Sequence, residues 1–173
     1  MKTTAFFFLL LTAAAPIGAQ TCDIQSRPLS TPNERFKDNG DGTLTDIQSG
    51  LTWMRCALGQ TWNSATCVGT PSGHAWQATL NAADQLNKQG GYAGHRDWRV
   101  PHIPELAMIS ERQCADPRIN LGLFPATPAA PFWSATPRKG FDNDAYMLSF
   151  GPEGATPSNK GEGHFVRLVR NGK

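Results

Sequence analysis

Three basic side chains lie in two glycine-bordered loops of the C-terminal third of the sequence. Arg138 and Lys139 follow an apolar run, and Lys160 lies in a glycine-rich stretch before the last apolar run. If the two loops meet, they form a basic patch suited to sulfated or carboxylated sugars, because a guanidinium binds such groups through paired hydrogen bonds. Tyr146 or an exposed Trp is the candidate ring for stacking on a sugar face. Ordinary solvated loop charge is the alternative interpretation.

Acidic residues gather at two places where a hard cation could bind. Asp142 and Asp144 lie on a loop before an apolar run, where a solvated turn is the alternative. Residues 38–46, Asp-Asn-Gly-Asp-Gly-Thr-Leu-Thr-Asp, suggest a calcium loop, but Gly40 and Gly42 occupy positions where the EF-hand needs oxygen ligands. Turn dipeptides account for the whole stretch. We therefore expect a hairpin there, and no bound metal or cofactor.

Catalytic motifs are not evident in the sequence. There is no Gly-X-Ser-X-Gly nucleophile motif. An acid–base pair for sugar hydrolysis would need two neighbouring carboxylates, and no spacing brings together any two of Glu105, Glu111, Glu153 and Glu162. We expect a protein that binds a ligand and does not turn it over.

The N-terminal residues predict export. Met1 and Lys2 precede an apolar run over 5–11 and small residues over 13–19, which is typical of a secretory signal peptide cleaved after Ala19. The run is shorter than the roughly 20 apolar residues of a membrane span, so we expect no span after cleavage. The expected location is the periplasm or the medium.

All four cysteines follow this segment. An even count in an oxidising compartment indicates two disulfides. Of the three possible pairings we favour Cys56–Cys67, which closes a short loop, and Cys22–Cys114, which pins an N-terminal arm. A zinc site is the alternative, but the spacing of Cys56 and Cys67 is unlike that of close zinc ligands.

Composition limits the partners. The chain has 173 residues with 16 basic and 14 acidic side chains, and removal of Lys2 with residues 1–19 leaves a nearly neutral domain. Such a surface disfavours nucleic acid, which needs a basic face. We divide the chain into a signal peptide (1–19), an arm (20–33) and one domain (34–173), which is long enough for a single core.

The elements that must position these residues follow from local patterns. Residues 35–55 read as short strands joined by Asn-Gly, Asp-Gly and Ser-Gly turns. A helix beginning near Trp76 carries apolar residues at helical spacing and stops at Gly90 and Gly91. A second helix is expected over about 104–112, with a proline at its start.

The last third of the chain reads as strands and loops. Apolar strands are expected over 132–136, 145–150 and 164–170, with irregular chain over 116–131 and a flexible loop over 151–163. Strands, two helices and strands in that order indicate an α+β fold, in which the chain ends share an antiparallel sheet. Trp98 and residues 132–134 are expected in the core, and Asp97 is expected to pair with an Arg or a backbone N–H.

Several stretches together resemble the Lcl C-terminal domain family. They are residues 35–54, 91–106 with Asp-Trp-Arg-Val-Pro, 132–137 with Phe-Trp-Ser, and 166–170, in the family's order. The resemblance implies an extracytoplasmic bacterial protein with a C-type lectin-like fold. In the collagen-like Legionella protein that names the family, the domain follows a collagen stalk and is linked to adhesion and glycosaminoglycan binding. This chain has no Gly-X-Y tract, and it lacks the acidic triplets of calcium-dependent lectins.

Three functions follow as expectations. The first is an exported, adhesin-like domain that recognises a carbohydrate or a glycosaminoglycan-like polyanion. The second is a protein–protein module of the bacterial envelope, a pilus or a secretion system. The third is an envelope enzyme.

Overall fold

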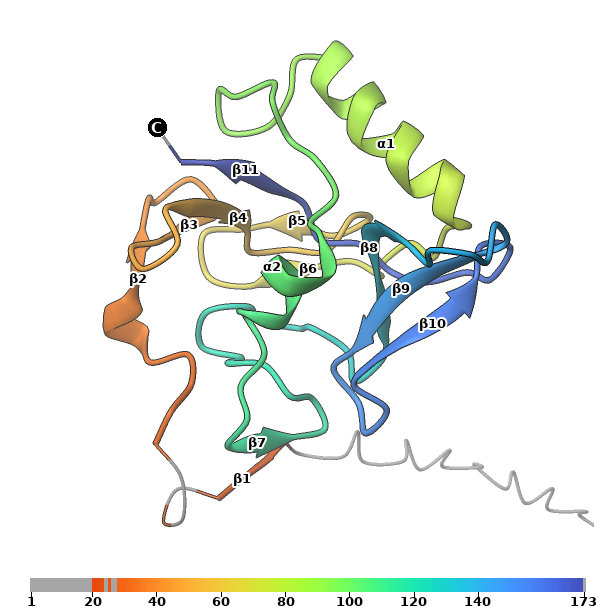
Figure 1. The fold of residues 1–173 in the computed structure, drawn as a ribbon. Helices are drawn as coiled ribbons and strands as arrows, with labels where there is room; N and C mark the ends of the chain where they lie inside the picture. The colour runs from red at the N-terminus through yellow and green to blue at the C-terminus, as the bar shows by residue number, and fades with distance from the viewer. Residues whose placement is uncertain (1–19, 24, 26–27, 173) are drawn as a thin grey trace, which may run out of the picture.

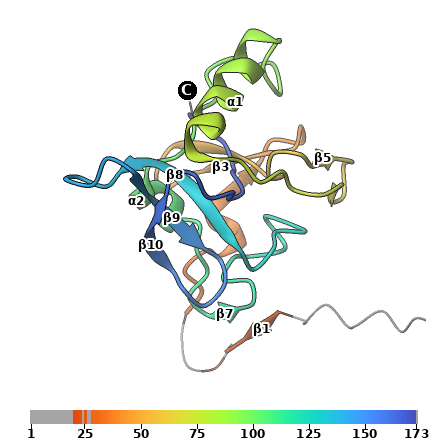
Figure 2. The same ribbon diagram turned by 90° about the vertical axis from the view of Figure 1, so that its right-hand side faces the viewer.

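The computed structural model describes residues 20–23, 25 and 28–172, and the predicted signal peptide lies outside the described residues. Sheets of four and three strands form the body of the domain, and the longer helix lies above them (Figure 1). A quarter turn shows the three-stranded sheet between this helix and a small strand pair at the far end (Figure 2). Strands, two α-helices and further strands follow along the chain, which confirms the α+β class.

The four-stranded sheet joins the two ends of the domain. Its order is β11-β4-β3-β2, and all neighbours are antiparallel. Its strands are β2 (Phe36–Asp38), β3 (Thr43–Asp46), β4 (Leu51–Met54) and β11 (Val169–Asn171). Gly40 and Gly42 turn the chain between β2 and β3 with φ of 79° and 87°, a conformation that glycine adopts at low cost. The predicted turns and the pairing of the chain ends are confirmed.

The three-stranded sheet has the order β10-β9-β8. It consists of β8 (Pro131–Pro137), β9 (Asp144–Ser149) and β10 (Ala155–Asn159). The expectation of a flexible loop over 151–163 is wrong, because β10 lies within it and pairs with Asp144–Leu148 of β9. Pro157 is compatible with this strand because β10 is at the sheet edge, where one side needs no hydrogen-bond donors.

The chain between the two sheets is less regular than expected. The prediction of one strand over 164–170 is wrong, since His164 bridges His74, Phe165 bridges Phe132 in parallel, and only Val169 begins a strand. Within these few residues the chain passes from the three-stranded sheet to the four-stranded sheet. Its side chains therefore contact two layers and do not follow a single sheet face.

A buried guanidinium supports this crossing. Arg167 is fully buried, and its Nη1 donates to the carbonyl oxygens of Met54, at 3.0 Å, and of Arg55. Its Nη2 donates to Oγ1 of Thr127 at 2.6 Å, and the group lies 4.8 Å from the ring centre of Phe124. Burial lowers the pKa of Arg167. The side chain ties the crossing segment to the end of β4, because these oxygens replace the water that a buried cation loses.

The first helix, α1 (Trp76–Lys88), confirms the helix predicted from apolar spacing. Ala83 is buried, and Leu80 and Leu86 pack in the same cluster. The chain turns at Gly90 and Gly91, which have φ of 117° and 76°.

The second helix, α2 (Ile103–Ala107), is shorter than the expected 104–112. Residues 110–119 form a hairpin instead, in which Ser110 bridges Ile119 and the N–H of Glu111 donates to the carbonyl of Arg118 at 3.0 Å. These cross-chain bonds replace the helical i to i−4 bonds. The prediction for 108–112 is therefore wrong.

Both predicted disulfides are present. Cys22–Cys114 joins residues 92 apart in sequence and links β1 (Thr21–Cys22) to β7 (Cys114–Ala115), which pair with each other. Cys56–Cys67 joins residues 11 apart, beside the pair formed by β5 (Thr61–Trp62) and β6 (Cys67–Val68). A short 3₁₀ turn, η1 (Asn33–Arg35), connects the arm to β2. The arm is thus covalently tied to the middle of the chain.

Three apolar clusters hold the layers together. The largest joins the four-stranded sheet, α2 and the inner side of β8 and β9, and the second lies beneath α1 around Trp98. A third surrounds Trp133, with Trp76 of α1 packed against it. Trp98 is 2% exposed, and Phe132 and Trp133 are 0% exposed, so their predicted core role is confirmed.

Candidate functional site

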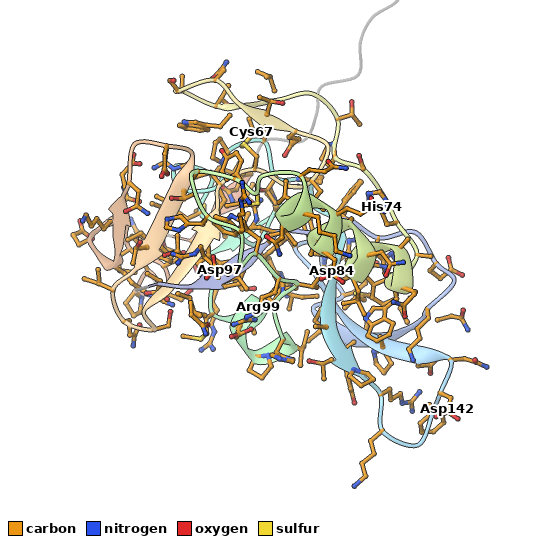
Figure 3. The ribbon with its side chains drawn as sticks, turned by 90° about the horizontal axis from the view of Figure 1, so that it is seen from above. Cys67, His74, Asp84, Asp97, Arg99 and Asp142 are labelled. Atoms are coloured by element: carbon orange, nitrogen blue, oxygen red, sulfur yellow. A yellow bond between two sulfur atoms is a disulfide. The ribbon has the colours of Figure 1, made fainter. Side chains whose placement is uncertain are left out.

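The two predicted basic loops do meet in the fold. The N–H of Lys160 donates to the carbonyl of Asn143 at 2.8 Å, and the N–H of Trp76 donates to the carbonyl of Lys160 at 2.9 Å. The loop between β8 and β9 and the loop after β10 therefore lie side by side next to the start of α1. Figure 3 shows Asp142 near the end of the first loop, which projects from the body.

Two of the three cations in these loops already have internal partners. Arg138 donates from Nη1 to Oδ2 of Asp144 at 3.0 Å, and its guanidinium lies 3.6 Å from the ring centre of Phe141. Lys160 donates from Nζ to the carbonyl of Asp142 at 2.6 Å and lies 4.6 Å from a ring centre of Trp76. Only Lys139 is exposed without a partner among the described residues. The patch therefore offers less free positive charge than its composition suggests.

Tyr146 lies on the other side of the three-stranded sheet from Lys160. Side chains alternate along a strand, and Ala145 and Met147 face Trp133 and Trp76 in the third cluster. Tyr146 consequently faces away from Trp76, over which Lys160 lies. The structure brings Arg138, Lys139 and Lys160 together at one end of the sheet, but Tyr146 does not join them.

Several carboxylates of the candidate cation loops take part in internal contacts, whereas Asp142 contributes only its backbone carbonyl. Asp144 pairs with Arg138, as described above. In the first hairpin, Asp38 accepts from the N–H of Gly40 at 2.9 Å and from Nη2 of Arg55 at 2.8 Å. Oδ1 of Asp41 accepts from the N–H and the hydroxyl of Thr43. Within the described part of the chain, no three His, Cys, Asp or Glu side chains are grouped as metal ligands.

A different pair of cations lines a hollow of about 430 Å³ at the opposite end of the three-stranded sheet. The hollow lies between the end of α2, the 110–119 hairpin and the turn from β9 to β10. Arg112 and Arg118 are exposed at its wall, and neither guanidinium has a partner among the described residues. Ser110 and Ser149 add hydroxyl groups, and Leu148 and Ala107 add apolar surface.

Backbone hydrogen bonds fix the positions of the two arginines in the hairpin. The N–H of Arg118 donates to the carbonyl of Phe150 at 2.6 Å, which holds the hairpin against the end of β9. The N–H of Arg112 donates to Oγ of Ser30 in the arm at 2.8 Å. Cys114, which forms a disulfide with Cys22, lies between the two arginines in sequence. Both guanidinium groups are therefore attached to a segment that is fixed on both sides.

Glu111 also borders this hollow, but its carboxylate is used internally. Its two oxygens accept five hydrogen bonds, from the N–H and hydroxyl groups of Ser30 and Thr31 and from the N–H of Gln113. Burial alone would raise the pKa of Glu111, but these hydrogen bonds outweigh it and lower the pKa to about 2. Glu111 thus stays ionised and serves as the anchor of the arm, which leaves the arginine side chains free.

Sequence patterns could not identify Arg112 and Arg118. The first falls in a segment predicted as helix, and the second in one predicted as irregular chain. The useful signal is their placement on either side of Cys114, because a cysteine that ties the hairpin to the arm also fixes its neighbours.

Comparison with known proteins identifies one family. The model of the Lcl C-terminal domain matches residues 42–170. The chain belongs to the Lcl C-terminal domain family, and the match falls within the predicted domain. A comparison with curated proteins finds no match. Across residues 20–23, 25 and 28–172, no helix combines the length and the apolar character that crossing a membrane requires.

Proposed function

We propose that this protein is an exported, C-type lectin-like domain that recognises an acidic carbohydrate or a glycosaminoglycan-like polyanion. The observation that carries the proposal is the hollow lined by Arg112 and Arg118, whose guanidinium groups have no partner among residues 20–23, 25 and 28–172. A guanidinium binds a sulfate or carboxylate through two parallel hydrogen bonds. Its weak hydration also lowers the cost of removing water on binding.

The form of the hollow supports a sugar-borne anion. Its volume of about 430 Å³ falls within the range of small-ligand sites. Hydroxyl groups of Ser110 and Ser149 can share hydrogen bonds with ring hydroxyls, and Leu148 offers apolar contact for the carbon face of a sugar ring. A longer polyanion could extend beyond the rim.

Export is supported by the cysteines. All four form disulfides, and none is free. Such pairing is typical of the periplasm and of secreted proteins. Together with the predicted signal peptide, this favours an extracytoplasmic location. Free thiols in protein taken directly from intact cells would contradict it.

The binding proposal is tested by titration calorimetry with a heparin oligosaccharide. The Arg112→Ala/Arg118→Ala double variant should bind at least about tenfold more weakly, because two charge-assisted contacts are lost. The matched control is Lys88→Ala/Arg96→Ala, which removes the same charge from exposed positions outside the hollow. Arg138→Ala/Lys139→Ala tests the other patch. Absent binding, or equal losses in all three variants, would overturn the proposal.

The projecting loop supports a second candidate function, recognition of an envelope protein. Phe141 is 52% exposed and lies near Lys139, which has no partner in the part of the chain that the structure describes. Aromatic side chains of this kind often provide the central contact of a protein interface. Pull-down from an envelope fraction with wild type and with Phe141→Ala tests it. If wild type and Phe141→Ala retain the same partner equally, Phe141 of this loop is not the contact that binds it.

A further inference from the structure

The outer face of the four-stranded sheet contains a second, polar hollow of about 360 Å³. It lies where the 92–97 loop borders the sheet, and Figure 3 shows Asp97, which belongs to this loop. Every residue that lines it is polar or glycine: Asn39, Asp41, Thr43, Thr45, Thr52, His95, Arg170 and Gly172. It shares no lining residue with the Arg112–Arg118 hollow.

Strand register explains why this face is polar. Thr45, Thr52 and Arg170 stand opposite one another across β3, β4 and β11. Their neighbours in the next row, Leu44, Trp53 and Val169, point to the other face and belong to the largest core cluster. Met54 and Leu168 lie further along the same face of the sheet as the polar row. They belong to the apolar cluster beneath α1. The helix thus covers one part of this face and leaves the polar part open.

Hydroxyl and amide groups in the hollow already form a network. Oγ1 of Thr45 lies 3.1 Å from Oγ1 of Thr52, and Nδ2 of Asn39 lies within 3.0 Å of the hydroxyls of Thr43 and Thr45. Thr43 and Thr52 are 2% and 4% exposed. These groups are therefore fixed by the strands before any ligand arrives.

Two charged side chains of the hollow, Arg170 and Asp41, have polar atoms that no described residue uses. Arg170 is 8% exposed, its Nε donates to Oδ1 of Asp97 at 2.8 Å, and its two Nη groups have no partner among the described residues. Asp41 uses only Oδ1 for the bonds to Thr43, and no described residue donates to its Oδ2. The hollow therefore combines an unused acceptor with unused donors.

We propose that this hollow binds a neutral sugar unit through a pair of adjacent hydroxyl groups. A hydroxyl both donates and accepts, so one member of the pair can donate to Oδ2 of Asp41 while oxygens accept from the Nη groups of Arg170. The lining carries one carboxylate and one guanidinium, so it offers no surplus positive charge for a polyanion. The volume accommodates a monosaccharide unit.

Internal contacts hold the bordering loop in place. Tyr92 and His95 exchange backbone hydrogen bonds of 2.9 and 3.0 Å, and the Asp97–Arg170 pair joins the loop to β11. Gly91 packs directly on the carbonyl of His95, where a side chain would collide. A site formed in advance loses less conformational entropy on binding.

Saturation-transfer NMR and a ¹⁵N-shift titration with methyl glycosides of glucose, galactose, mannose and N-acetylglucosamine test this site. We expect saturable binding of at least one glycoside, with shifts centred on residues 39–45, 52, 95 and 170. Asp41→Asn should weaken it about tenfold, since a hydrogen bond to a charged group is lost. Thr52→Val, which changes the hydroxyl network but not the volume, is the second variant. Matched controls are Asp84→Asn on the exposed side of α1 and Thr156→Val in β10.

The outcomes distinguish sugar binding at this site from polyanion binding at the Arg112–Arg118 hollow. Neutral-sugar binding should be unchanged in the Arg112→Ala/Arg118→Ala variant, and heparin binding should be unchanged in Asp41→Asn. Absence of saturable binding to every glycoside would overturn the inference. So would an equal effect of Asp41→Asn and Asp84→Asn, or loss of neutral-sugar binding only in the double arginine variant.

Discussion

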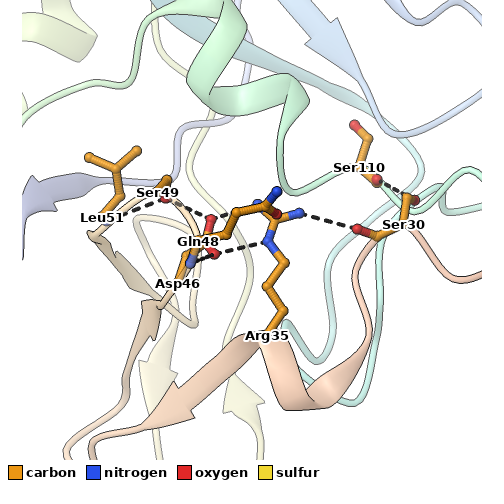
Figure 4. Close-up of polar contacts among 7 residues, drawn as sticks. All are labelled: Ser30, Arg35, Asp46, Gln48, Ser49, Leu51 and Ser110. Atoms are coloured by element: carbon orange, nitrogen blue, oxygen red, sulfur yellow. Dashed lines mark hydrogen bonds and ion pairs between the residues drawn. The ribbon is translucent and has the colours of Figure 1, made fainter.

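Both carboxylate oxygens of Asp46 bind the guanidinium of Arg35, at 2.9 Å from Nε and 2.6 Å from Nη2 (Figure 4). Asp46 also accepts from Oγ of Ser49 and the N–H of Gln48, and Nη1 of Arg35 donates to the carbonyl of Ser30. The Asp46 side chain is fully buried. One ion pair therefore connects the arm, the β2–β3 pair and the turn before β4.

Removal of one partner should leave the other charge buried and unpaired. Asp46→Asn should lower the free energy of unfolding by about 3–5 kcal/mol, measured by urea denaturation. Asp144→Asn is the matched control, because its pair with Arg138 is roughly one-quarter to one-third exposed and should contribute less than about 1 kcal/mol. Similar losses in the two variants would contradict the central role of the buried pair.

Acid should loosen the contact of Glu111 with Ser30 and Thr31 of the arm. Its pKa is lowered to about 2 from an ordinary value of 4.5, so its contribution is complete above about pH 4.5 and is lost as the pH falls towards 2. Glu111→Gln should cost about 2–3 kcal/mol at pH 7 and flatten the dependence of stability on pH between 4.5 and 2. Urea titrations at several pH values measure both effects. Exposed Glu162→Gln is the control, and a variant with the wild-type acid profile would disprove this role.

Two glycines of one turn should respond differently to the same substitution. A Cβ at Gly42 would collide with Oη of Tyr92 and approach Cδ1 of Trp62 to 2.9 Å, whereas a Cβ at Gly40 meets nothing within 4 Å. Both have positive φ, so Gly40→Ala should cost only the conformational strain of about 1–2 kcal/mol. Gly42→Ala should cost about 3 kcal/mol or more. Equal thermal-denaturation shifts would show that Tyr92 does not pack against this turn.

These contrasts show which parts of the fold were predictable. The β2–β3 turn and α1 depend on residues close in sequence, so glycine positions and apolar spacing were sufficient. β10 was missed because its composition resembles a loop, and it is a strand only through pairing with β9. The same physical reason applies to the sites. The Arg112–Arg118 hollow lies between α2, a hairpin fixed by Cys22–Cys114 and the end of β9. No local sequence pattern predicts that these three segments come together.

The polar hollow has a spectroscopic reporter. Burial raises the pKa of Tyr92, and the nearby negative charge of Asp41 raises it further. Asp41→Asn removes the second effect and should lower the Tyr92 pKa, while burial keeps it above the ordinary value of 10.0. Absorbance titration of tyrosinate in a Tyr146→Phe background isolates Tyr92, because the chain has two tyrosines. Asp84→Asn should leave the titration unchanged. An Asp41→Asn curve that overlays the parent curve would place the 92–97 loop away from Asp41, and the hollow would then lack its bordering wall.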